Sequence, residues 1–381
     1  MMKACLEYLI KHNVFVQLCY RKVVSFFFNI LGCFIKTDPK LVLLTSMSGD
    51  QYSDSPEVLF QAMLKDNHFK DYHYIWAFKA PEKFKVPHAE TIKIDTMRYF
   101  ITALKAKIWI TNVNIERGLN FKKKHTIYLN TWHGTGPKKG GNAVPGRKDY
   151  DFSRVDIFCC DGQYTHDVFV KWWNAKEENM LWCGRPREDE LFDFAPSDAI
   201  SIRKKIGWPD NKKVILYMPT WRESNNRELN LNLWRKKLSQ DYVLLIREHH
   251  FSKYDEIDND GFIYDVSKYN DVNELYYISD ILISDYSSAF FDYGLLGKPM
   301  LCYAYDYDSY IKSPGLFMDL KNEFPTGIQY SEEEVIEKIL NMNYQQACAA
   351  TKNYVKKYVD HSQNATQCCL NKLIELTENE H

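Results

Sequence analysis

Residues 280–303 read DILISDYSSAFFDYGLLGKPMLCY, and this stretch decides the fold class. An apolar run is followed by a hydroxyl-rich turn, a short helical segment and a second apolar run, which is the pattern of a strand–helix–strand unit in a parallel sheet. Ser287 and Ser288 stand where the helix is expected to begin. Free backbone N–H groups and the positive end of the helix dipole favour an anion there. The stretch therefore predicts an α/β fold that binds a phosphorylated ligand.

The same alternation extends along most of the chain from residue 41. Apolar runs alternate with polar or helical stretches, and the polar segment 195–213 divides them into two groups. This pattern predicts two α/β domains with a cleft between them, and a helical region after Ser331. The expected strands are 41–46, 72–78, 107–111, 126–130 and 156–160 in the first group, and 213–218, 242–247, 280–284 and 299–305 in the second.

Length and composition agree with a globular protein that has more than one core. A chain of 381 residues exceeds what one hydrophobic core usually organises. Hydrophobic residues make up 45% of the chain and charged residues 26%, as in folded domains. The formal net charge is −1, so no overall field attracts nucleic acid, and local groups must hold any anionic ligand.

The ten cysteines form no recognisable ligand pattern. Cys159–Cys160 and Cys368–Cys369 are adjacent pairs, and the chain has no CxxC or Cys/His spacing of the kind that binds zinc. Adjacent cysteines can bind metal or take part in redox chemistry, but packing as small buried hydrophobic residues is the commoner role. We therefore expect reduced thiols in a cytosolic protein and no structural metal site.

The amino-terminal segment 1–36 is predicted to associate with a membrane. Residues 3–21 alternate polar and apolar side chains at near-helical spacing, and residues 23–35, VVSFFFNILGCFI, are almost entirely apolar. This apolar run is shorter than the roughly 20 residues that cross a bilayer, so we expect helices that lie in the interface. Basic residues could add attraction to an anionic membrane surface: Lys3, Lys11, Arg21, Lys22 and Lys36.

Two other interpretations compete with membrane docking. The segment could be an ordinary helix packed on the body of the protein, or a cleaved signal in which Ile30–Cys33 approximates a lipoprotein site. Asn29 interrupts the apolar core of such a signal, which makes the signal the weakest of the three. We therefore expect a peripheral protein on the cytoplasmic face of the cell membrane.

Polar residues gather where the expected strands end, which is where ligands bind in open α/β sheets. The strand at 126–130 leads into TWHGTGPKKGGN, residues 131–142, whose glycines allow close backbone approach. His133 stands at the strand exit, where an imidazole can accept a proton near neutral pH. The alternative is an ordinary hydrogen-bonded loop histidine.

Two further strand ends carry arginine. The strand at 213–218 runs into Pro219–Arg222, in which a hydroxyl and a guanidinium could grip a phosphate. The strand at 242–247 ends in Arg247 and runs into Glu248–His250, so a second arginine and a second histidine could support a charged transition state. The alternative is a surface ion pair of Arg247 with Glu248 beside a structural histidine. Two more charged residues complete the candidates: Arg187 in a turn near the domain boundary, and Asp292, one helical turn after Ser288.

Four motifs occur together, namely TWHGT (131–135), MPTWRE (218–223), REHHF (247–251) and SDYSSAFFDYGLLGKPMLCYAYDYDSY (284–310). With this set the chain resembles the glycerophosphotransferases that build teichoic acids from CDP-glycerol or CDP-ribitol, over most of its length beyond about residue 40. The resemblance implies a GT-B fold of two Rossmann-like domains facing a central cleft. It places the domains at 37–200 for the acceptor and 201–345 for the CDP-polyol donor, followed by a helical tail at 346–381.

The resemblance also implies roles for individual residues. His133 matches the family's proposed base, and His249 matches its second essential histidine near the diphosphate. The family commonly has HGTPLK where this chain has HGTGPKK, so Gly136 replaces a proline. Residues expected to contact the substrates are Gly134, Thr135, Gly136, Pro137, Arg187, Thr220, Trp221, Arg222, Arg247, Glu248, Ser287, Ser288 and Asp292.

The implied activity is transfer of glycerol phosphate or ribitol phosphate from the CDP-activated donor to a hydroxyl of a lipid-linked acceptor of the polyprenyl diphosphate type, with CMP leaving. Such an enzyme would act in teichoic acid or capsule biosynthesis in bacteria, with no cofactor and no metal. One alternative is a GT-B glycosyltransferase that uses a nucleotide sugar, because the fold is shared. The other is a catalytically silent, membrane-associated subunit that binds nucleotide.

Overall fold

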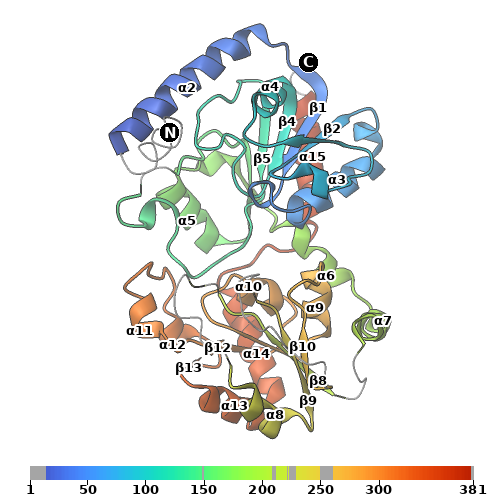
Figure 1. Ribbon diagram of the computed structural model, residues 1–381, viewed down its shortest axis with the longest axis vertical. Coiled ribbons are helices and arrows are strands. Elements are labelled where there is room, and N and C mark those ends of the chain that lie inside the picture. The colour runs from blue at the N-terminus through green and yellow to red at the C-terminus, as the bar shows by residue number, and fades with distance from the viewer. Residues whose placement is uncertain are drawn as a thin grey trace.

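The computed structural model describes residues 14–147, 150–207, 212–220, 222, 229–248 and 261–378. These residues form two lobes, each built on a parallel sheet whose two faces are covered by helices (Figure 1). The predicted α/β fold with two parallel sheets is confirmed.

The first sheet has seven strands in the order β3-β2-β1-β4-β5-β6-β7. In its centre, Leu43 of β1 lies between Ile75 of β2 and Trp109 of β4. All residues of β4 are buried, because helices cover both faces of the sheet. The strands are β1 (Asp38–Thr45), β2 (His73–Phe78), β3 (Glu90–Lys93), β4 (Ala106–Thr111), β5 (Ile127–Asn130), β6 (Ile157–Cys160) and β7 (Met180–Trp182).

The second sheet has six parallel strands in the order β10-β9-β8-β11-β12-β13. Counted along its own chain segment this is 3-2-1-4-5-6, the order of a doubly wound nucleotide-binding sheet. The strands are β8 (Lys213–Tyr217), β9 (Tyr242–Ile246), β10 (Ile263–Asp265), β11 (Ile281–Ser284), β12 (Met300–Tyr303) and β13 (Ile328–Gln329).

All nine predicted strands are present, and four further strands, β3, β7, β10 and β13, were not predicted. Each of these four lies at an edge of its sheet. Edge strands are short and pack on fewer neighbours, so they carry a weaker apolar pattern. The β3 sequence Glu90–Lys93, with charged residues at both ends, illustrates this.

The helices connect successive strands or cover the sheets. Several begin at side chains that cap their free N–H groups, such as Thr96, which accepts from the N–H of Tyr99, and Asp271, which accepts from two N–H groups. The helices are α2 (Val14–Phe34), α3 (Asp54–Lys65), α4 (Met97–Lys105), α5 (Gln163–Trp173), α6 (Glu190–Asp193), α7 (Pro196–Ile206), α8 (Leu231–Leu238), α9 (Val272–Ile278), α10 (Ala289–Gly294), α11 (Tyr307–Tyr310), α12 (Leu320–Glu323), α13 (Glu332–Leu340), α14 (Tyr344–Lys356) and α15 (Ala365–Glu378).

The region after Ser331 is helical, as predicted, but its helices belong to different lobes. Helix α14 packs against α10 in the second lobe, whereas α15 returns to the first lobe and lies beside α3 (Figure 1). Leu370 and Leu373 of α15 are buried in the first-lobe core. The carbonyl of Asp161 also accepts hydrogen bonds from the N–H groups of Asp360 and His361 where the chain crosses back.

Helix α2 lies along the flank of the first lobe and has two different faces (Figure 1). Phe28 on the inner face is buried and stacks on Phe100 at a ring-centroid distance of 4.5 Å. Two polar residues of the apolar run form hydrogen bonds with the first lobe. Ser25 Oγ accepts from the N–H of Asn120 at 2.9 Å, and Asn29 donates to the Asn120 carbonyl at 2.7 Å. The outer face exposes large apolar side chains: Leu18, Tyr20, Val23, Phe26, Phe27, Ile30 and Phe34.

The helix therefore packs on the protein and still presents an unburied apolar surface. Within the part of the chain that the structure describes, no helix combines the length and the apolar character needed to span a bilayer. The portion of the predicted membrane segment before residue 14 lies outside the described residues.

Candidate active site

A cavity of about 680 Å³ lies between the two lobes. The loop after β5 and one side of α5 form its first-lobe wall, and residues that follow β8, β9, β10 and β11 form its second-lobe wall. The carboxyl ends of strands from both sheets thus meet in one place, where doubly wound sheets bind ligands. The predicted residues in this lining are His133, Gly134, Thr135, Gly136, Thr220, Arg247, Glu248, Ser287 and Ser288.

The turn after β5 directs His133 toward the cavity. Asn130 at the end of β5 accepts a hydrogen bond from the N–H of Trp132, and Trp132 adopts a left-handed conformation with φ of +52°. The His133 Nδ1 atom lies 2.8 Å from the carbonyl oxygen of Asn112, which can only accept, so Nδ1 carries the proton. The Nε2 atom of the neutral ring then carries no proton, and its lone pair can accept one.

The protein keeps His133 neutral at physiological pH. Desolvation lowers the pKa of its imidazole from the ordinary value, and the nearby charges of Arg187 and Arg185 act in the same direction. The Asn112 carbonyl and the Asp54 carboxylate oppose this shift without cancelling it. A neutral histidine with a free Nε2 atom can accept a proton from a hydroxyl group.

The loop that carries His133 is fixed to both lobes. Arg185 donates to Thr135 Oγ1 at 2.8 Å and to Asp161 at 2.6 Å, and Thr135 itself donates to Asp161. Gly134 lies directly against Ser288 of the second lobe: a Cβ atom at Gly134 would stand 2.7 Å from the Ser288 side chain. With a φ of +142°, this position requires glycine both for its backbone conformation and for the close approach.

A second contact between the lobes lies just beyond Gly136. The N–H of Lys139 donates to the carbonyl of Gly315 at 3.0 Å, and the N–H of Phe317 donates to the carbonyl of Pro137 at 2.7 Å. Pro137 is therefore engaged in an interlobe backbone bond and is not among the cavity-lining residues. Lys138 and Lys139 line the cavity and supply positive charge there.

The second lobe contributes Arg247, Ser287 and Ser288 to the cavity. Arg247 donates to the carbonyl oxygens of Val266 and Tyr269 at 3.0 and 2.5 Å, partners that carry no net charge. Its positive charge is thus available to an anion in the cavity. Ser288 immediately precedes α10, as predicted, and Ser287 Oγ accepts from the N–H of Ala289.

Arg222 is engaged in a different way. Its guanidinium donates to Asp285 at 2.7 Å and to Asp306 at 2.8 and 3.0 Å, and it lies over the rings of Tyr286 and Tyr310 at 5.2 Å. Two carboxylates balance its charge, and Arg222 is not among the residues that line the cavity. In this structure Arg222 joins the loops after β8, β11 and β12.

Arg187 and Asp292 lie at the interface of the lobes rather than in the cavity lining. Arg187 donates to Asp54 Oδ2 at 2.6 Å and to both carboxylate oxygens of Asp292 at 2.9 and 2.8 Å. Desolvation is the largest single influence on the pKa of Asp54 and acts to raise it. The charge of Arg187 and the hydrogen bonds from Arg187, Asn112 and the Ser55 N–H together outweigh desolvation, so the pKa of Asp54 is lowered. Asp54 belongs to the first lobe and Asp292 to the second, so Arg187 bridges them.

Two predicted residues, Trp221 and His249, lie outside the described residues. Sequence reasoning missed five charged residues that organise the site: Asp54, Asp161, Arg185, Asp285 and Asp306. Three of them, Asp161, Asp285 and Asp306, follow strands β6, β11 and β12 within three residues. The strand-end pattern that identified the arginines could have identified these carboxylates.

The sequence also matches known proteins along most of its length. A family model described as CDP-Glycerol:Poly(glycerophosphate) glycerophosphotransferase matches residues 26–368. The chain is 30% identical over 368 residues to the teichoic acid glycerol-phosphate transferase of Staphylococcus aureus, covering 89% of this chain and 90% of that protein. It is 34% identical over 333 residues to the teichoic acid poly(glycerol phosphate) polymerase of Staphylococcus epidermidis, covering 80% of this chain and 46% of that protein. The chain therefore spans under half the length of that polymerase.

Solved structures agree with this relationship. The wall teichoic acid polymerase TagF superposes with a TM-score of 0.79 at 30% sequence identity, covering 96% of both chains. A TagF variant soaked with CDPG superposes with a TM-score of 0.81 at the same identity. The family match spans both sheets and every described residue of the cavity lining. The chain belongs to the CDP-glycerol:poly(glycerophosphate) glycerophosphotransferase family.

Proposed function

We propose that the protein transfers glycerol phosphate from CDP-glycerol to a hydroxyl group of a membrane-linked acceptor, with CMP as the leaving group. The observation that carries this proposal is the shared cavity, where a neutral histidine from one lobe meets the Arg247 guanidinium and two serines from the other. Relatives named for glycerol phosphate are 30–34% identical, against 24–27% for those named for ribitol phosphate, which favours glycerol.

In the proposed reaction the acceptor oxygen attacks the phosphorus that carries the glycerol. The bond between this phosphorus and the bridging oxygen of CMP breaks as the new phosphodiester forms. His133 takes the hydroxyl proton on Nε2, because its Nδ1–H is committed to the Asn112 carbonyl. Holding both reactants in one cavity turns the encounter into an oriented, effectively unimolecular step.

The second lobe is proposed to hold the donor, as in the GT-B arrangement. Arg247 is held by the uncharged carbonyl groups of Val266 and Tyr269 and brings a positive charge to the cavity, which Ser287 and Ser288 line with hydroxyl groups. Lys138 and Lys139 reach the same cavity from the first lobe. Such groups can offset the negative charge of a diphosphate and of the leaving CMP.

We further propose that α2 docks the protein on the cytoplasmic face of a membrane. Its inner face is packed on the first lobe, whereas Phe26 and Phe34 on the helix are 67% and 83% exposed. An apolar helix face fixed to the protein surface and flanked by Arg21, Lys22 and Lys36 has the pattern of an interfacial anchor for anionic lipid. The lipid-linked acceptor would lie in that same membrane.

The direct test uses purified protein with a lipid-linked acceptor analogue. We expect CDP-glycerol to yield CMP and a lengthened acceptor joined by a phosphodiester, and CDP-ribitol to react more slowly. A glycoside formed from a nucleotide sugar would instead support the glycosyltransferase alternative. Binding of CDP-glycerol without CMP release would support the silent subunit.

Replacement of His133 tests the proposed base. We expect His133→Ala to lower kcat by about 10²–10⁴-fold while CDP-glycerol binding, measured by calorimetry, stays close to that of the parent. Because the pKa of His133 lies below its ordinary value, parent activity should persist to pH values below about 6.5 and fall as the imidazole becomes protonated. The exposed His73 provides the control, and His73→Ala should leave activity unchanged. Equal losses of binding and turnover in His133→Ala would make His133 a ligand contact only.

A methyl group at Gly134 tests the close approach of the lobes. We expect Gly134→Ala to reduce kcat/KM by about 10²-fold, because the new Cβ collides with Ser288 and displaces the His133 loop. Gly136→Ala is the matched control, since a Cβ there meets no atom within 4 Å and its effect should be much smaller. Similar activity of the two variants would show that the contact between Gly134 and Ser288 does not position the site.

Charges on the outer face of α2 test membrane docking. We expect Phe26→Glu with Phe34→Glu to weaken sedimentation with anionic lipid vesicles by at least about tenfold, because two exposed apolar side chains would no longer enter the bilayer. CMP release with a soluble acceptor analogue should not change. Ile200→Glu, at another exposed apolar residue, is the control on α7. Unaltered vesicle binding of the double variant would refute docking through α2.

A further inference from the structure

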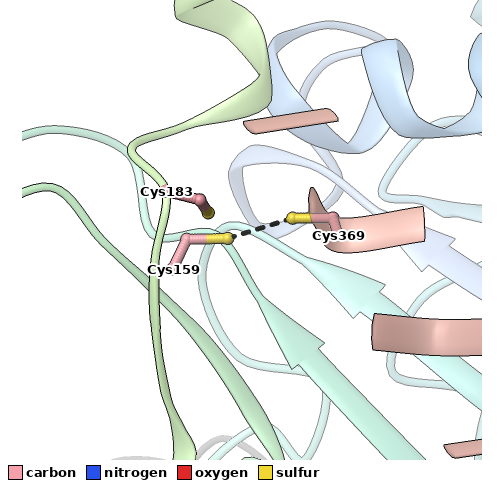
Figure 2. Close-up of side chains that lie close together, drawn as sticks. All are labelled: Cys159, Cys183 and Cys369. Carbon is pink, nitrogen blue, oxygen red and sulfur yellow. Dashed lines mark hydrogen bonds between the residues drawn. The ribbon is translucent and has the colours of Figure 1, made fainter. Parts of the chain in front are cut away.

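Three cysteine side chains from distant parts of the sequence meet inside the first lobe. Cys159 is on β6, Cys183 follows β7 and Cys369 is on α15, and all three are buried. Their Sγ atoms lie within 4.8 Å of one another, and the Sγ atoms of Cys159 and Cys369 are 3.4 Å apart. Figure 2 shows the three side chains gathered around one point. None of them lines the interlobe cavity.

The neighbouring cysteines do not join this group. Cys160 follows Cys159 on β6, and because side chains alternate along a strand, its thiol points elsewhere and donates to the carbonyl of Gly162. Cys368 precedes Cys369 on α15, is only partly buried and lies outside the group. The two adjacent pairs in the sequence thus each contribute one sulfur to the group, and the spacing of cysteines along the chain gives no sign of it.

The positions of the sulfur atoms distinguish three interpretations. A disulfide would require the 3.4 Å separation of Cys159 and Cys369 to contract to about 2.05 Å, would need an oxidant, and would leave Cys183 unused. A metal ion with bonds of about 2.3 Å needs sulfur atoms about 4 Å apart, which requires only small shifts of the three. Simple packing of small apolar side chains would not require the three sulfur atoms to point toward one another.

We propose that Cys159, Cys183 and Cys369 form a trithiolate site for a thiophilic metal ion such as Zn²⁺ or Cu⁺. Thiolates are the ligands that these soft ions prefer, whereas Mg²⁺ prefers oxygen ligands. On binding, three metal–sulfur bonds form and the three thiol protons are released to solvent. This site is independent of the proposed transfer reaction.

A metal ion at this site would hold the C-terminal helix α15 on the first lobe. Helix α15 follows the last element of the second lobe and returns to the first, where the N–H groups of Ala365 and Thr366 donate to Asp189 at 2.9 and 2.8 Å. A metal ion bound to Cys369 would join α15 to β6 and to the turn after β7. Because binding requires the folded arrangement, the ion would stabilise the attachment of α15 to the first lobe.

Metal binding to the reduced protein tests the proposal. Cys5, Cys19 and Cys33 of the N-terminal segment are first replaced by serine, so that they do not compete for the ion. The reduced, metal-free protein is then dialysed without oxygen against Zn²⁺ alone or Cu⁺ alone, and bound metal is measured. We expect one ion of at least one of these metals per chain, a raised thermal midpoint, and a sulfur-to-metal absorption band when Co²⁺ replaces Zn²⁺.

Single substitutions assign the ligands. Cys159→Ser, Cys183→Ser and Cys369→Ser should each lose the absorption band and at least tenfold in affinity, whereas Cys368→Ser and Cys160→Ser should retain both. Circular dichroism identifies any variant that fails to fold. Alkylation of the parent gives a test without variants. Because the three thiols are buried even without metal, their rates are compared with and without the ion, and bound metal should slow them while leaving the Cys368 rate unchanged. Absence of binding by either ion, equal binding by all variants, or peptide mapping that finds Cys159 joined to Cys369 in the purified protein would overturn the proposal.

Discussion

The bridge from Asp54 through Arg187 to Asp292 holds the two lobes together. The planar guanidinium forms short hydrogen bonds to one carboxylate from each lobe, at 2.6 Å to Asp54 and at 2.8 Å to Asp292. These groups are largely removed from water. In such a buried site, a carboxylate that loses its partner destabilises the protein by about 3–5 kcal/mol. Separation of the lobes at this point is therefore unfavourable. The bridge also lies next to the contact of Gly134 with Ser288, because a Cβ atom at Gly134 would stand 3.3 Å from the Arg187 guanidinium. It therefore supports the loop that carries His133.

The arginines at the strand ends have different roles, which their sequence positions do not distinguish. Arg222 and Arg247 each follow a strand of the second sheet. Two carboxylates balance the charge of Arg222, whereas two carbonyl groups hold Arg247 in the cavity wall. The partners of Arg222 are 63 and 84 residues away in sequence. Only the order of the strands brings Asp285 and Asp306 to Arg222, so sequence reasoning predicted a phosphate contact where the structure has an internal ion cluster.

The features that sequence reasoning predicted well are those determined by local chemistry. Buried central strands carry long apolar runs, and His133 follows such a run directly, so both the strand and the histidine could be placed from the sequence. The sequence could not predict the bridge at Arg187, the return of α15 or the meeting of three cysteines. Each of these depends on packing between segments more than a hundred residues apart. Ser25 and Asn29 interrupt an apolar run because both form hydrogen bonds with Asn120, which is more than 90 residues away in the sequence.

The first lobe carries α2, α15 and the loop of His133, and this distribution bears on the proposed reaction. Helix α2 attaches through Phe28, and α15 attaches through Leu370 and Leu373, so both are fixed to the sheet that positions His133. If the outer face of α2 lies on the membrane, the orientation of that sheet relative to the membrane is also fixed. A lipid-linked hydroxyl would then reach His133 from the membrane side, while a soluble nucleotide donor would enter the same cavity against the second lobe. We infer that the lobe that carries the proposed base is the one anchored to the membrane, because a lipid-linked acceptor could not leave the bilayer, whereas a nucleotide donor could diffuse.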